Sequence, residues 1–318
     1  MPSSAHSSAV PSAAGPSLGT SPAAPDRPSP GPLLCLVLAG LLWGTGGLTG
    51  TLLGRAAGLS PLSVAALRLL AGGGIIVACR LVPGRRWPSG RAAWARIAVT
   101  GALAATFQGA YFSAVSLTSV SLATLVTIGA TPVIVLVAEL LLGRRRLDRP
   151  AVTRTALALA GLGLLVGLPS GGYGTVATAE SAAMALLASA GFAVLTLAGA
   201  VPVPGLGEET VTGLGFTLGG LIVLPLAAAT GGLAFRPGIA ALGWLAALAV
   251  GPTAVAYTLY FRGLRGSRAS TGALLSLLEP LTATVLSVAF LGNRLSPTGI
   301  AGAVLLAAAV ISTARPGG

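Results

Sequence analysis

The sequence predicts an all-α membrane protein with ten transmembrane helices, arranged as two inverted five-helix repeats. The first supporting observation is composition: the 318-residue chain is 54% hydrophobic and only 8% charged, whereas a soluble domain carries about 25% charged residues. The second is a doubled pattern. Residues 127–147 begin with an apolar run that contains Pro132, and residues 276–296 repeat this layout with Pro280, which lies 148 positions after Pro132.

Ten apolar runs approach or reach the length of about 20 residues that a helix needs to cross a bilayer. The expected spans are residues 33–53, 61–82, 94–114, 119–142, 151–168, 181–200, 211–230, 239–261, 269–291 and 297–313. Residues 1–31 are rich in Pro, Ser and Ala and are expected to form a disordered tail. The two repeats are expected at residues 32–170 and 177–314.

The arginines predict how the chain lies in the membrane. Every cation is an arginine and the formal charge is +12. If the N-terminus is cytoplasmic, 15 arginines fall on cytoplasmic segments and three fall outside, namely Arg55, Arg236 and Arg294. Positive residues gather on the cytoplasmic side of membrane proteins. The pattern therefore indicates a multi-pass protein of the cell (plasma) membrane, and it accounts for the charge without a nucleic-acid partner.

The repeats are expected to be inverted because each contains an odd number of spans. The loop after the fourth span contains Arg144–Arg146, whereas the loop after the ninth keeps only Arg294. That loss suits a second copy facing the opposite side. Inverted repeats with a proline-interrupted helix in corresponding positions are typical of secondary transporters, whose site lies at the repeat interface.

Glu279, beside Pro280, lies near mid-depth of the ninth span. An ionisable side chain there costs about 2.5–3.5 kcal/mol on insertion scales and is usually functional. Glu279 is a candidate ligand for a substrate ammonium or a proton carrier; the alternative is a glutamate that only ties helices together. Pro132 and Pro280 are candidate hinges that free backbone carbonyls, although membrane helices also tolerate prolines without a role.

Arg68 lies seven or eight residues into the second span, about 11 Å along a helix. It requires a counter-ion, either Glu279 or a substrate carboxylate, which a guanidinium can bind through two hydrogen bonds. The alternatives are a structural ion pair or a side chain that reaches part of the way to the interface.

Several other polar side chains fall within or near the spans. Trp43 and Gln108 are deep enough to contact a substrate, and Tyr111 is a further candidate. Tyr257 and Tyr260 approach the cytoplasmic boundary, where aromatic residues often form an interfacial belt.

Glu139 lies one turn from Arg144–Arg146. It is interpreted as an interfacial salt-bridge partner, with a ligand role as the alternative.

Three motifs resemble a known family: LLWGTGG (Leu41–Gly47), SPLSVAALRLLAGG (Ser60–Gly73) and ASTGALLSLLEPLTATVLSVAFLGNRLS (Ala269–Ser296). In this order they resemble the EamA-type branch of the drug/metabolite transporter superfamily, over both repeats. The LLEP segment is most similar to exporters of the threonine/homoserine type. The resemblance implies ten helices, both termini in the cytoplasm, and export of small metabolites driven by an ion gradient.

The sequence departs from the family at two positions. The family often has glutamate directly after the Leu-Gly that ends the fourth and ninth spans, and here these positions hold Arg144 and Asn293. Any role of those glutamates is therefore absent, which affects the coupling mechanism more than the fold.

The function expected is a gradient-driven exporter of amino acids or related amphiphiles by alternating access. Its expected partners are a small-molecule substrate, a proton or other coupling ion, and membrane lipids. Gly-x-x-x-Gly spacings at Gly163 and Gly215 suit helix packing, with a homodimer as one use. The alternatives are a passive channel or a lipid scramblase or flippase.

An intramembrane enzyme is the least favoured class. The single histidine, His6, lies in the tail, and Cys35 and Cys79 both fall inside expected spans. Neither a metal site nor a cofactor is expected, and no expected span contains an aspartate for a carboxylate dyad.

Overall fold

The computed structural model describes residues 30–81, 87–167, 172–230, 233–292 and 294–314. The first repeat contains α1 (Pro30–Ala57), α2 (Pro61–Arg80), α3 (Arg91–Leu117), α4 (Val120–Leu141) and α5 (Arg149–Val166). The second contains α6 (Thr175–Gly199), α7 (Glu208–Ala229), α8 (Ile239–Ala249), the π-helix η1 (Val250–Val255), α9 (Ala256–Leu264), α10 (Ala269–Leu275), α11 (Leu278–Leu291) and α12 (Pro297–Ala314). The tail expected at 1–31 lies almost wholly outside the described residues.

The predicted all-α membrane fold is confirmed. In the described ranges, nine helical stretches are long and apolar enough to cross a membrane. The tenth, α3, has 27 residues and packs against α6 and α7. The eighth span is α8, η1 and α9 in succession, and the ninth is α10 followed by α11. Several helices exceed their expected bounds; α1, for example, begins at Pro30 and ends at Ala57 instead of covering residues 33–53.

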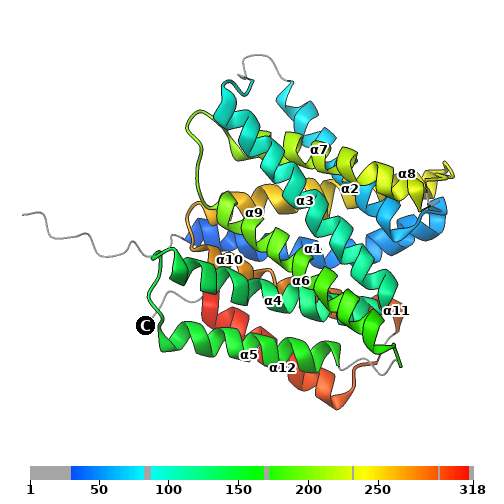
Figure 1. Ribbon diagram of the computed structural model, residues 1–318. Helices are drawn as coiled ribbons and strands as arrows, with labels where there is room; N and C mark the ends of the chain where they lie inside the picture. Colours follow the sequence, from blue (N-terminus) through cyan, green and yellow to red (C-terminus); the bar gives the residue numbers. More distant parts are fainter. Residues whose placement is uncertain (1–29, 82–86, 168–171, 231–232, 293, 315–318) are drawn as a thin grey trace, which may run out of the picture.

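Contacts between helices follow the inverted repeat (Figure 1). Helices α2 and α7 pack on each other, as do α5 and α12, and each pair holds equivalent helices of the two repeats. The pairing of α3 with α6 is mirrored by that of α9 with α1, and the pairing of α4 with α6 by that of α11 with α1. The equivalent helices therefore form one interlocked bundle.

Two ends of the bundle differ in charge. We call the end at which α2, α4, α6 and α9 finish the arginine-rich end, and the end at which α1, α3, α5 and α7 finish the arginine-poor end. At the arginine-rich end, ion pairs join Arg80 to Glu209, Arg145 to Asp148, and Arg265 to Glu208. Arg96 of α3 also donates to Ala198 O in the last turn of α6, at 2.7 Å, and to Val201 O just after that helix, at 3.0 Å.

Proline explains the π-helix in the eighth span. In an α-helix the Leu248 carbonyl would accept from the backbone N of residue 252, which is Pro252 and carries no hydrogen. The Thr253 hydroxyl donates to this carbonyl instead, at 2.8 Å. The Thr253 hydroxyl thus satisfies a carbonyl that would otherwise lack a hydrogen-bond donor, because the interior of a membrane contains no water.

Glycines allow the closest helix contacts. A Cβ on Gly161 of α5 would lie 2.6 Å from Leu306 N and 2.9 Å from Gly302 O of α12. Likewise, a Cβ on Gly215 of α7 would lie 2.7 Å from Thr100 Cγ2 of α3. Gly215 thus serves packing within the chain and lends no support to a homodimer.

We predict opposite effects for two alanine substitutions two residues apart in α5. Gly161→Ala should lower the thermal unfolding midpoint in detergent, because its Cβ meets backbone atoms and overpacking costs about 1–3 kcal/mol. Gly163→Ala has nothing within 4 Å of its Cβ, so it should be neutral or stabilising. Equal midpoints for both variants would contradict the α5–α12 contact.

Candidate functional site

A cavity of about 510 Å³ lies among helices of both repeats. Exposed Arg55, Pro61 and Val120 form its rim at the arginine-poor end, and Trp43 and Glu279 line its deep part, about halfway along their spans. The volume suits a small molecule, for which protein sites measure about 300–1,000 Å³. The cavity is therefore open toward the arginine-poor end.

All five side chains predicted to bind substrate or ion line this cavity. They are Trp43, Arg68, Gln108, Tyr111 and Glu279. They come from α1, α2, α3 and α11, so the fold brings together residues up to 236 positions apart in the chain.

Aromatic rings close the cavity toward the arginine-rich end. The ring centroid of Trp43 lies 4.9 Å from that of Tyr257, 4.7 Å from that of Tyr260 and 5.8 Å from that of Phe192. Tyr260 is fully buried, and its hydroxyl lies 2.9 Å from Thr196 Oγ1. Tyr257 and Tyr260 were expected near the boundary of the membrane. They are instead buried in the core, because α9 is covered by α1.

Arg68 is held by the π-helix. Its Nε donates to Thr253 Oγ1 at 3.3 Å and its Nη2 to Pro252 O at 3.4 Å. Gly72 makes room for this contact, since a Cβ there would lie 2.5 Å from Thr253 Cγ2. Both acceptors are uncharged, and among the described residues no carboxylate lies within 4.0 Å of the guanidinium. Arg68 therefore presents a positive charge at the cavity wall.

Glu279 lies just after a break in the ninth span. Residues 276–277 separate α10 from α11, and Glu279 N donates to Ser276 O at 2.9 Å. In a regular helix that carbonyl would accept from residue 280, which is Pro280 and lacks the hydrogen. Pro132 differs: it lies inside α4, which continues through it unbroken. The break places the partly exposed Glu279 side chain on the cavity wall.

The neutral polar side chains of the cavity differ in their bonding. The Trp43 Nε1–H is buried and has no hydrogen-bond acceptor among the described residues. Gln108 is also buried, whereas the Tyr111 hydroxyl lies 2.8 Å from Thr124 Oγ1. Trp43 thus brings an unused donor to the deep part of the cavity.

Comparisons with known proteins agree with this architecture. The family model of the EamA-like transporter family matches residues 31–167 and 180–315. The chain belongs to the EamA-like transporter family. It is similar to the uncharacterized transporter YwfM of Bacillus subtilis (strain 168), with 31% identity over 277 residues that cover 86% of this chain and 90% of YwfM.

A solved crystal structure shares the fold, with a TM-score of 0.73 and 22% sequence identity, covering 88% of this chain and 96% of the other. The protein is thus a multi-pass membrane transporter, and its family points to transport rather than catalysis. Within the described ranges, no group of three or more His, Cys, Asp or Glu side chains could hold a metal ion.

Two positions, Arg144 and Asn293, depart from the EamA pattern, and neither is among the described residues that line the cavity. Arg144 is exposed at the arginine-rich end, and Asn293 lies outside the described residues. Glu139 was interpreted as a salt-bridge partner of Arg144–Arg146. It instead accepts a hydrogen bond from the backbone N of Ser270 at 3.2 Å, and Arg145 pairs with Asp148.

Sequence reasoning missed two features of the site: Thr253, which binds Arg68, and the apolar side chains of Phe107 and Phe112 in the cavity lining. Thr253 carries no charge, so its role in holding Arg68 appears only when α2 and η1 are seen in contact. Pro252 inside an apolar run was the available signal, because a proline there forces a rearrangement of helical hydrogen bonds. Phe107 and Phe112, which also line the cavity, resemble any other apolar residues of a span.

We predict that two cysteines in α1 differ in reactivity. In a chain with Cys35 and Cys79 replaced by alanine, Gly47→Cys should react with a membrane-impermeant maleimide, because Gly47 lines the cavity and has open space beside it. Ala39→Cys should stay unreactive, since Ala39 is fully buried. Equal labelling of both sites in intact proteoliposomes would show that the cavity does not open as described.

Proposed function

We propose that this transporter is a gradient-driven exporter of small metabolites, with amino acids or related amphiphiles as its substrates. The observation that carries the proposal is that one cavity contains both the Arg68 guanidinium and the Glu279 carboxylate. A guanidinium binds a substrate carboxylate through paired N–H groups. A carboxylate and nearby aromatic faces, such as Trp43, suit a substrate ammonium. Phe107 and Phe112 suit an apolar side group.

Coupling to a proton follows from competition at Glu279. A proton and a substrate ammonium both bind the same carboxylate, so protonation from one side releases the ammonium and deprotonation on the other side allows it to bind again. Exchange of a proton for substrate is antiport. One charge crossing 100 mV is worth about 2.3 kcal/mol, which is enough to bias export.

In the proposed orientation the arginine-rich end and both termini face the cytoplasm, and the protein lies in the plasma membrane. The cavity then opens outward, as required of the state that releases substrate. The aromatic floor supports a carrier over a passive channel, because the rings of Trp43, Tyr257 and Tyr260 are buried and pack on one another there. Exposed apolar side chains such as Val285 and Phe290 would face membrane lipids.

Glu279→Gln tests the coupling. A panel of labelled amino acids in proteoliposomes identifies a transported compound, and its flux is then measured with and without a pH gradient. We expect the variant to lose the stimulation by the gradient, because a glutamine cannot carry a proton. Glu180→Gln, at an exposed carboxylate of α6, is the matched control and should behave as wild type. Undiminished gradient-driven flux in Glu279→Gln would remove this residue from the coupling step.

Arg68→Gln tests carboxylate binding. Losing a hydrogen bond to a charged group costs about 1.5–3 kcal/mol, so the KM for a carboxylate substrate should rise roughly 10- to 100-fold. The KM for the corresponding carboxamide should change little. Arg55→Gln, at the exposed rim, is the control for the loss of a cavity charge. A normal KM in Arg68→Gln would falsify direct binding of the carboxylate.

A further inference from the structure

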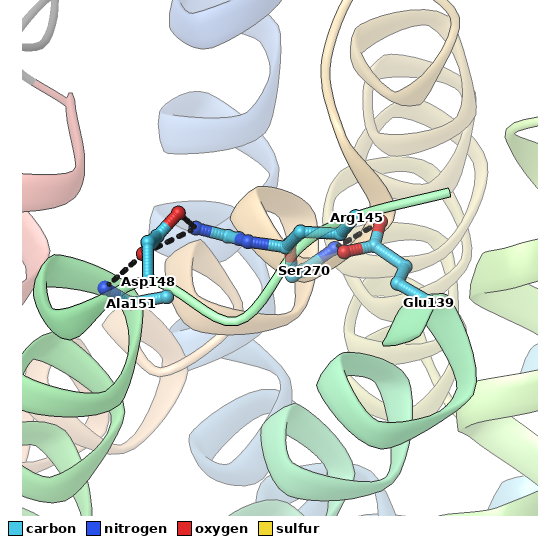
Figure 2. Close-up of polar contacts among 5 residues, drawn as sticks. All are labelled: Glu139, Arg145, Asp148, Ala151 and Ser270. Carbon is cyan, nitrogen blue, oxygen red and sulfur yellow. Dashed lines mark hydrogen bonds and ion pairs between the residues drawn. The ribbon is translucent and has the colours of Figure 1, made fainter. Parts of the chain in front are cut away.

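A buried hydrogen bond joins the two repeats at the arginine-rich end (Figure 2). Glu139, near the end of α4, accepts from the backbone N of Ser270, in the first turn of α10, at 3.2 Å. Arg145 donates from Nη1 to Ser270 Oγ at 3.0 Å, and its Nη2 lies 2.9 Å from Asp148 Oδ2. Ser270 is thus bound by two side chains of the first repeat, one through its main chain and one through its hydroxyl.

The contact is sealed from water. Glu139 is 5% exposed and Ser270 is 3% exposed. Val135 of α4 and Ala273 of α10 pack in the same buried cluster behind them. Because the second carboxylate oxygen of Glu139 is buried without a hydrogen-bond donor among the described residues, the Ser270 N–H is an essential partner for this carboxylate.

Asp148 anchors the arginine from the other side. It caps α5 by accepting from Ala151 N at 2.7 Å. Partial burial acts to raise the pKa of Asp148, but the hydrogen bonds from Arg145 and Ala151 outweigh it and hold the pKa below its usual value. Asp148 is therefore charged at neutral pH and keeps Arg145 directed at Ser270.

The equivalent place in the other repeat is built differently. When Pro132 and Pro280 are superposed, Ser270 corresponds to Leu122 and Glu139 corresponds to Ser287. Leu122 N donates to Ser119 Oγ, the N-cap of its own helix, at 3.2 Å. Helix α10 has no side-chain cap of its own, because its N-cap residue is Arg268. The second repeat thus takes from α4 the cap that the first repeat supplies for itself.

We propose that the Glu139–Ser270 hydrogen bond is an inter-repeat latch that keeps the arginine-rich end closed while the cavity is open at the opposite end. The inference rests on the proposed alternating-access function and names the contact that regulates which end opens. Opening the arginine-rich end separates α4 from α10, breaks the latch, and leaves a helix N-terminus uncapped. At the arginine-poor end, α4 keeps its Ser119 cap whether that end is open or closed. The latch therefore favours the state described here.

The latch is tested by two cysteine reporters in a chain with Cys35 and Cys79 replaced by alanine. Ala273→Cys, fully buried beside the latch, reports opening of the arginine-rich end, and Gly47→Cys reports opening of the cavity. Glu139→Ala should raise the rate of maleimide labelling at Ala273→Cys about tenfold, which corresponds to about 1.4 kcal/mol and to the loss of one hydrogen bond. The same Glu139→Ala substitution should slow maleimide labelling at Gly47→Cys.

Matched variants separate the parts of the contact. Glu139→Gln keeps the side-chain length and an acceptor oxygen for the Ser270 N–H, so its effect should be smaller. Ser270→Ala keeps the N–H that Glu139 binds and loses only the bond from Arg145, so it should also shift labelling less than Glu139→Ala. Glu180→Ala removes an exposed carboxylate of α6 and should leave both rates unchanged.

Two outcomes would overturn the latch. One is an unchanged rate at Ala273→Cys in Glu139→Ala. The other is a faster rate there without slower labelling at Gly47→Cys, which indicates loosening of the fold instead of a change of state. No substrate is needed for labelling, so the latch can fail while the flux results for Glu279→Gln and Arg68→Gln stand. Conversely, a reciprocal labelling shift with normal flux in those two variants would keep the latch and reject the proposed substrate site.

Discussion

The structure depends on the cost of placing charge and unpaired backbone groups in a hydrocarbon interior. Inside a bilayer each polar group must find a partner in the protein or in a water-filled space. Arg68 finds the Pro252 carbonyl and the Thr253 hydroxyl, and these exist in the right place because the eighth span widens into a π-helix. Glu279 reaches the same cavity because the ninth span breaks before it. The break before Glu279 lies beside the cavity, and the π-helix turns its polar side inward, where Thr253 is fully buried, while Val250 and Val255 at its two ends are exposed.

Symmetry explains why two copies of one unit can form a carrier. The pairs α2–α7 and α5–α12 join equivalent helices, and small residues such as Gly161 and Gly302 allow their backbones to meet. The copies nevertheless differ in detail: the first repeat has an unbroken helix through Pro132, and the second is broken before Pro280. An inverted pair of identical units would have no preferred side, so differences of this kind give the two ends distinct properties.

Much of this could be predicted from the sequence, because membranes impose strong rules on composition. Apolar runs predicted the spans to within several residues, and the rule that polar residues inside spans face a cavity singled out Arg68, Glu279 and Gln108, which line one cavity. What could not be predicted depends on contacts between distant segments. Glu139 and Ser270 are 131 positions apart, and nothing near Glu139 in the sequence marks a backbone N–H as its partner in place of the adjacent arginines. The effect of the departure from the family at Asn293 stays a prediction of the sequence, because Asn293 lies outside the described residues.

Helix α3 has a consequence for how the protein is made. Of the described transmembrane helices it is the one whose hydropathy falls short of that of an independent span, and it contains Gln108 in its interior. Its packing partners α6 and α7 follow it in the chain and are synthesised later. A helix this polar is stabilised in the bilayer by its neighbours more than by lipid. We therefore expect α3 to depend on the second repeat for its stable place in the bilayer, which would make the two halves co-dependent during assembly.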